Sequence, residues 1–143
     1  MALSKADITP QDVDYLMGGD LLNQIITANF AARDLGIPFF GLYGACSTIT
    51  ESLSLAAMLI DGGYAERILC VAASHFSTAE RQYRYPLEQG TQRPPSAQWT
   101  VTGAGAVLLG RAGTGPRITM VTTGKVVDYG IKDANNMGAA LAP

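Results

Sequence analysis

The chain is predicted to fold as an α/β protein in which helices cover the faces of a sheet that contains parallel strands. Three observations predict this class. Segments with helical periodicity alternate with short apolar runs along residues 21–73, and glycines separate them. The run at residues 67–73 is uninterrupted, as in strands covered on both faces. Apolar residues make up 48% of the 143 residues, which is enough to form one buried core.

The first elements are expected to be a helical turn and a short strand. Thr9 can cap a turn that has a proline at its first position and Asp12 within it. The apolar residues 15–17 then form a short strand. We expect this strand to stop at Gly18 and Gly19.

A helix is predicted over residues 21–35, and Gly36 is placed to end it in a left-handed conformation. Asp20 directly precedes this helix, so it is first of all a candidate N-cap. It could instead form the wall of a binding pocket, and both interpretations stay open. The apolar residues that give the helical spacing are Leu21, Leu22, Ile25, Ile26, Phe30 and Leu35.

A buried strand is predicted over residues 37–42, because this run is apolar and bounded by glycines. A second helix should follow over residues 48–61, with Thr48 and Glu51 as a capping box. Its apolar stripe consists of Ile49, Leu53, Ala56, Ala57 and Ile60.

The remaining chain should contain three more strands and one long loop. Residues 67–73 are expected to form a parallel strand in which Cys70 is an inert core residue. Residues 74–98 show no periodicity, and an ordered loop of that length is usually functional or a contact site. Residues 100–109 and 118–127 are predicted to form a hairpin.

Composition and charge exclude several classes of function. Ten basic and 12 acidic residues give a net charge of -2, so no cationic field favours nucleic acid as a partner. No apolar run approaches the roughly 20 residues of a membrane-spanning helix, and no secretory signal is visible, so we expect an intracellular protein. The two cysteines have no zinc or disulfide spacing, so neither a metal nor a cofactor is expected.

Cys46 is the main candidate for a functional residue. It follows a predicted buried strand and directly precedes a predicted helix. The positive end of a helix stabilises a thiolate and can also hold an anion such as a carboxylate. The alternative is that Cys46 is a small core residue at the start of the helix.

Two further residues could contribute to a site. His75 is the only histidine, so any imidazole base within this chain must be this residue, although a lone histidine at a strand end is more often structural. Arg84 lies in the long loop near two other arginines and could bind an anionic ligand. It could equally pair with the glutamates of the same loop.

Taken together, these motifs resemble the thiolase superfamily, in which a cysteine after a strand starts a long buried helix. Residues 41–48 carry the cysteine motif, and residues 103–108 resemble the glycine-rich strand of ketoacyl synthases and thiolases. A closer resemblance is to thiolase-like proteins of endospore-forming bacteria, and it covers essentially the whole chain. It rests on residues 19–26, 38–48, 79–86, 97–105, 126–128 and 136–140.

The resemblance implies an incomplete thiolase-like layered fold. Residues 1–143 would form one partial N-terminal domain, most of one half of a duplicated fold, without its first strand and helix. In catalytic members, the partner histidine and the second cysteine or asparagine come from the other half. Thr102 also stands where such enzymes often carry aspartate. Uncovered sheet edges of such a fragment would favour self-association, or a role that requires another chain.

The implied function is binding of dipicolinic acid and assistance in its uptake into the developing spore, without catalysis. Asp20 and Cys46 match pocket positions of the family, and His75 and Arg84 are added as candidate ligand-binding residues. A calcium ion could bridge Asp20 to the ligand, which would then bind as its calcium chelate. The implied partners are membrane proteins of the stage V sporulation A operon at the spore inner membrane, and a second copy in a homo-dimer. The alternative function is an acyltransferase that uses Cys46 as its nucleophile.

Overall fold

The computed structural model describes residues 2–22, 24–75, 101–133, 136 and 138–139. Its centre is a four-stranded sheet in the order β2-β1-β3-β4. β1 pairs in parallel with β2 and β3, and β4 pairs antiparallel with β3. The predicted α/β class is confirmed. The strands are β1 (Tyr15–Asp20), β2 (Phe39–Gly41), β3 (Arg67–Ser74) and β4 (Gly103–Gly110).

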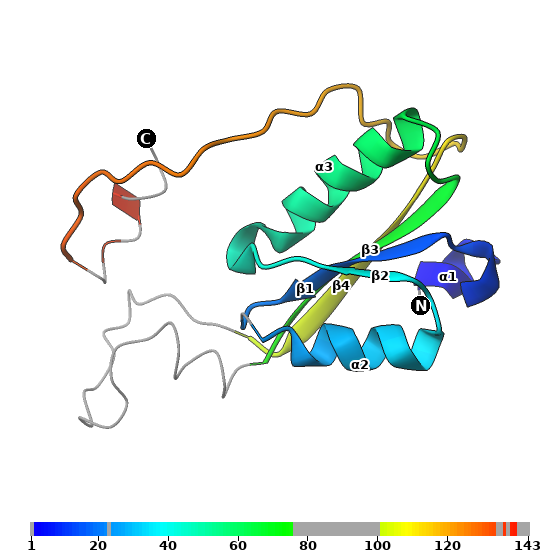
Figure 1. Cartoon of the computed structure of the whole chain (residues 1–143), viewed down its shortest axis with the longest axis horizontal. Helices are drawn as coiled ribbons and strands as arrows, with labels where there is room; N and C mark the ends of the chain where they lie inside the picture. Colours follow the sequence, from blue (N-terminus) through cyan, green and yellow to red (C-terminus); the bar gives the residue numbers. More distant parts are fainter. Residues whose placement is uncertain (1, 23, 76–100, 134–135, 137, 140–143) are drawn as a thin grey trace.

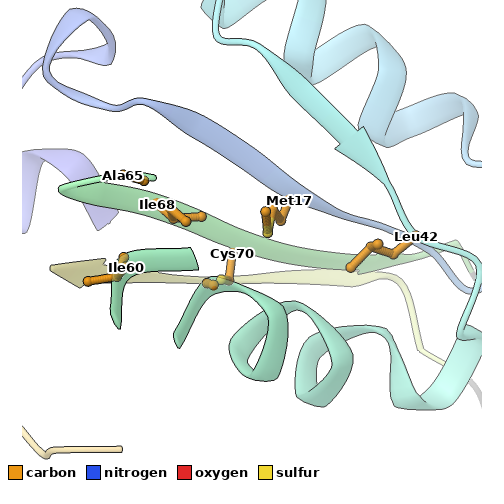
Figure 2. Close-up of a cluster of buried hydrophobic side chains, with 7 residues drawn as sticks. Met17, Leu42, Ile60, Ala65, Ile68 and Cys70 are labelled. Atoms are coloured by element: carbon orange, nitrogen blue, oxygen red, sulfur yellow. The ribbon is translucent and has the colours of Figure 1, made fainter. Parts of the chain in front are cut away.

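Two helices, α2 (Ile26–Leu35) and α3 (Thr48–Asp61), cover opposite faces of the sheet (Figure 1). Consecutive residues of a strand therefore pack in different hydrophobic clusters, one on each face of the sheet. Leu16 packs in the cluster that contains Ala32 of α2, whereas Met17 packs in the cluster that contains Ala56 of α3. This alternation follows from the period of two along a strand. Figure 2 shows the α3-side cluster, whose other members are Leu42, Ile60, Ala65, Ile68 and Cys70.

β1 continues through Gly18 and Gly19, so the prediction that the strand stops there is wrong. A Cβ added at Gly18 would lie 1.9 Å from the carbonyl oxygen of Val71. A Cβ added at Gly19 would lie 2.2 Å from that of Leu42. The two glycines thus permit a close approach of backbones inside the sheet, which is the other common role of glycine in a strand.

α2 begins at Ile26, five residues later than predicted. The reason is that the chain is still bonded to the sheet at Leu21, whose N–H donates to the carbonyl oxygen of Ala73 at 2.9 Å. The predicted end is confirmed. Gly36 is left-handed with φ 66°, and its N–H donates to the carbonyl oxygen of Ala32.

α3 has the predicted bounds, but its predicted capping box is absent. Thr48 is buried, and its Oγ1 has no hydrogen-bond partner within the described residues. The helix buries a narrower and more polar line than the predicted apolar stripe, because small side chains fit closest to the sheet. The buried line consists of Thr48, Ser52, Ala56 and Ile60, with Ile49 and Leu53 beside it.

The strand predicted over residues 37–42 is shorter and less buried than expected. β2 has three residues and lies at the edge of the described sheet, so only β1 pairs with it there. Phe40 is 48% exposed and contacts Tyr15, with ring centroids 5.3 Å apart. An edge position explains why this apolar run is not covered on both sides.

β3 confirms the predicted parallel strand, and Cys70 within it is 0% exposed. β4 confirms one arm of the predicted hairpin, but the second arm is wrong. Residues 118–127 form no strand, and many of their apolar side chains are exposed. A β-prone run becomes a strand only when it pairs, and this segment runs away from the sheet (Figure 1). Residues 76–98 of the predicted long loop lie outside the described residues.

The amino end of the sheet is closed by short helical turns and one carboxylate. α1 (Ala2–Lys5) precedes the predicted turn at Pro10–Asp12, which is confirmed. The side chain of Asp14 accepts the N–H groups of Glu66 at 2.7 Å and Arg67 at 2.9 Å. It thereby joins the starts of β1 and β3. In the part of the chain that is described, no helix has the length and apolarity that a membrane span requires.

Candidate functional site

An open hollow of about 390 Å³ lies where β1 and β3 end and β4 begins. The carboxyl ends of parallel strands are where ligands bind in open α/β sheets, because the loops there diverge. Most of the lining residues are small, which makes the hollow wide and shallow. They are Leu21, Ala45, Cys46, Ala72, Ala73, Ser74, Val101, Gly103, Ala104 and Gly105.

Cys46 lines this hollow from the turn that leads into α3. It lies in the 3-10 turn Ala45–Ser47, is exposed, and precedes the α-helix by two residues. Ala45 has φ 48°, a left-handed conformation that costs a residue with a Cβ about 1–2 kcal/mol. Such a strained backbone beside a cysteine is typical of functional sites.

The other cysteine has the opposite environment. Cys70 faces the core between the sheet and α3, and burial raises the pKa of its thiol to about 12. The predicted core position is confirmed, and because a thiol with that pKa is scarcely ionised near neutral pH, we expect Cys70 to be unreactive.

The start of α3 has no side-chain cap from the residue before it. The hydroxyl of Ser47 donates to the carbonyl oxygen of Gly44 at 2.9 Å instead of accepting from the helix. The positive end of α3 therefore lies beside the hollow without a cap from Ser47, although the first turn of the helix carries Glu51, whose carboxylate lies close to Gly44.

Asp20 caps the other helix. Its carboxylate is 7% exposed, and its Oδ2 accepts the N–H groups of Thr27 at 2.7 Å and Ala28 at 3.4 Å. Its Oδ1 has no partner within the described residues. Asp20 thus performs the N-cap role without being the residue next to the helix, because Ile25 occupies that position.

The four sequence-predicted residues do not all come together. Cys46 lines the hollow, whereas Asp20 binds the start of α2 on the opposite face of the sheet. His75 is exposed directly after the end of β3, outside the set of lining residues. Arg84 lies outside the described residues.

No group of three or more histidine, cysteine, aspartate or glutamate side chains could hold a metal ion within the ranges that the structure describes. A calcium ion at Asp20 would therefore need oxygen ligands from backbone, from a ligand or from elsewhere in the protein.

Sequence reasoning missed the residues that give the hollow its shape. Leu21 was assigned to a helix, and the small residues Ala72 and Ala73 were counted only as strand core. Their position at the carboxyl ends of two neighbouring parallel strands was the available signal.

Comparison with known proteins gives the family. The sequence profile described as "Stage V sporulation protein AD" matches residues 1–143. A stage V sporulation protein AD from Bacillus subtilis (strain 168) is 51% identical over 143 residues, which is all of this chain and 42% of that protein. The chain thus spans less than half the length of this curated relative.

Solved structures give the fold. A 3-oxoacyl-acyl-carrier-protein synthase III from Aquifex aeolicus is similar over 78% of this chain and 35% of its own, with 23% identity and a TM-score of 0.58. A tetronic acid condensing enzyme is similar over 78% of this chain and 34% of its own, with 24% identity and a TM-score of 0.57. At this identity the likeness concerns the fold alone. It confirms the predicted thiolase-like architecture, of which this chain contains a part. The chain therefore belongs to the stage V sporulation protein AD family.

Proposed function

We propose that this protein binds dipicolinic acid in the hollow beside Cys46 and takes part in moving it into the developing spore. Membership of a sporulation family supports the cellular role. The observation that carries the ligand assignment is the open hollow at the uncapped start of α3. The protein would act at the spore inner membrane beside membrane proteins of the same operon, and as a homo-dimer.

The shape and charge of dipicolinate suit this hollow. The ligand is a flat pyridine ring with two carboxylates, a dianion near neutral pH. A volume of about 390 Å³ falls within the usual range for small-ligand sites, roughly 300–1,000 Å³. The small side chains of Ala72 and Ala104 leave room for a flat ring, and the positive end of α3 attracts a carboxylate.

The second carboxylate needs a separate partner. Arg84 could bind it through a bidentate pair, which is the strongest common arrangement for this group. Asp20 would repel the dianion if it faced the ligand. Its Oδ2 instead accepts the N–H groups of Thr27 and Ala28, and its side chain is not among those that line the hollow.

Calorimetry tests the proposal on the full-length Bacillus subtilis relative, and on this chain with and without a Cys46→Ala change. We expect dipicolinate to bind and the variant to bind at least several-fold more weakly, because the altered turn adjoins the hollow. Benzoate serves as a control ligand with one carboxylate and should bind more weakly. Absence of dipicolinate binding by the unchanged relative would remove the ligand assignment.

Acyl transfer through Cys46 is the second candidate. It is favoured by the exposed thiol at the edge of the hollow and by the condensing enzymes among the structural neighbours. Such chemistry needs a base near the sulfur, which commonly contributes about 10²- to 10⁴-fold, and donors for the oxyanion. His75 is the only histidine of the chain and follows the end of β3.

Mass spectrometry distinguishes the two candidates. We expect no acyl adduct on Cys46 after incubation with acyl-CoA donors. An adduct that forms and is then discharged to a second substrate would establish the acyltransferase instead.

A further inference from the structure

The connection between β1 and α2 links Asp20 to one rim of the hollow. Leu21 lines the hollow, and its N–H donates to the carbonyl oxygen of Ala73, another lining residue. At the far end of this connection Ile25 is buried, with 3% exposure, in a left-handed conformation with φ 46°. The capped start of α2 thus fixes a strained and buried residue.

Ile25 lies against the strand ends that lead to the other rim. A Cβ added at Gly41 would lie 2.4 Å from Ile25 Cδ1, and one added at Gly19 would lie 3.1 Å from Ile25 Cγ2. Ile25 therefore packs against the ends of β1 and β2, which stay paired through the N–H of Leu42 and the carbonyl oxygen of Gly18. The segment after Gly41 continues directly to Cys46.

We propose that Asp20 is a positioning residue for the ligand site. It holds the start of α2, and through Leu21 and Ile25 it sets both rims of the hollow without contacting the ligand. The proposal rests on the proposed function only for the identity of the ligand.

The chemistry of both groups supports an indirect role. A carboxylate is only an acceptor when ionised, and dipicolinate near neutral pH offers it no donor. Asp20 instead uses Oδ2 to bind the amides of Thr27 and Ala28, and its side chain is not among those that line the hollow. The carboxylate is buried on the α2 side, whereas Cys46 precedes α3 on the other face of the sheet.

Amide hydrogen exchange on this chain, without ligand, tests the positioning directly. In Asp20→Ala we expect the amides of Leu21, Leu42 and Ser47 to exchange at least about fivefold faster relative to the amide of Cys70, as a lost cap predicts. In Asp20→Asn we expect values within about twofold of the parent, because the amide oxygen accepts the same two bonds. Rim amides unchanged in Asp20→Ala, or equally fast in both variants, would contradict the proposal.

Two further variants separate positioning from general loss of stability. Asp14→Ala removes a carboxylate that also accepts two amides, but at the opposite end of β1, and should not accelerate the rim amides relative to Cys70. Ile25→Ala keeps the cap and removes the side-chain packing against the ends of β1 and β2. It should accelerate Leu42 and Ser47, and it decides the question if Asp20→Ala does not fold. Unchanged exchange at both amides in Ile25→Ala would contradict the proposed path.

Titration of the same variants with dipicolinate tests whether Asp20 affects ligand affinity through its hydrogen bonds to α2. Affinity retained within about threefold in Asp20→Asn and lowered at least about fivefold in Asp20→Ala supports positioning. Equal weakening in both variants contradicts it, since the loss would then follow the charge of Asp20 and not its two hydrogen bonds to α2. If the parent protein binds no dipicolinate, the proposed function fails while the exchange experiment still decides the role of Asp20.

Discussion

The two ends of β1 carry similar carboxylates in different surroundings. At the amino end, Asp14 is exposed and its side chain accepts two amides from the start of β3. At the carboxyl end, Asp20 is buried, binds the start of α2 with one oxygen and has an unpartnered second oxygen within the described residues. The amino end is closed by its own hydrogen bonds. The carboxyl end has a hollow, a strained turn and an exposed cysteine, so we assign function to that end.

The two helix starts at the carboxyl end differ in the same way. α2 is capped by a carboxylate, whereas Ser47 gives α3 no side-chain cap. A start capped by a carboxylate already has its anion. The first turn of α3 carries Glu51, but no side chain caps its first N–H groups, so we propose the anion site there, beside Cys46, and a structural role for Asp20.

The largest expected effect on the free energy of unfolding is that of substituting Gly18 in β1. Gly18→Ala should destabilise the fold by about 3 kcal/mol, because the new Cβ would collide with the backbone of Val71. Gly103→Ala, at the rim of the hollow, should change stability by less than about 0.5 kcal/mol, because no atom lies within 4 Å of its added Cβ. Urea unfolding measures both. Equal effects would show that the rim is as tightly packed as the strand.

The two cysteines should differ strongly in reactivity. At pH 8, a pKa of about 12 leaves on the order of one Cys70 thiol in ten thousand ionised, and the side chain is buried. Cys46 is exposed, so iodoacetamide should label it at least about 100-fold faster. Peptide mass spectrometry over time measures the two rates. Comparable rates would contradict the assigned surroundings of the two thiols.

Asp14 should make a smaller contribution that depends on pH. Hydrogen bonds from the amides of Arg67 and Glu66 hold the pKa of this carboxyl below its usual value. The unfolded chain therefore binds the proton more readily, so the contribution is present above the unfolded pKa of about 3.9 and is lost as pH falls through the folded pKa. Asp14→Ala should cost about 1 kcal/mol at pH 7. The difference from the parent should shrink below about pH 4.

Urea unfolding across that pH range provides the measurement, with Asp34→Ala as the control. Asp34 forms an ion pair with the neighbouring Arg33 on the surface, and such pairs contribute little. A cost of Asp14→Ala that stays constant down to pH 2 would contradict the hydrogen-bond account.

Local patterns were sufficient for much of the fold. The bounds of α3 and the buried parallel β3 follow from periodicity and from an uninterrupted apolar run. Predictions from local patterns were wrong where backbone contacts with a segment far away in the sequence determine the conformation. Gly18 and Gly19 are required by β3 and by the chain after β2, and the start of α2 is delayed because Leu21 bonds to β3. The failed strand at residues 118–127 has strand propensity but no described partner.

The candidate site was predictable only in part for the same reason. A cysteine between a strand and a helix is a local signal, and the residue that it singles out, Cys46, lines the hollow. The interpretation of Asp20 as a helix cap is confirmed. Its partners lie seven and eight residues along the chain, however, and no capping pattern predicts that separation. The small residues of β3 and β4 can be recognised as the lining of the hollow only once the pairing of these two strands is known.

The most direct test of the account is protection of Cys46 by the ligand. The protein is treated with iodoacetamide with and without saturating dipicolinate, and labelling is followed at Cys46 and Cys70. Because the ligand would occupy the hollow that Cys46 lines, we predict at least about tenfold slower labelling there and unchanged labelling at the buried cysteine. Labelling at Cys46 that is unaffected by bound dipicolinate would contradict the assignment of the site.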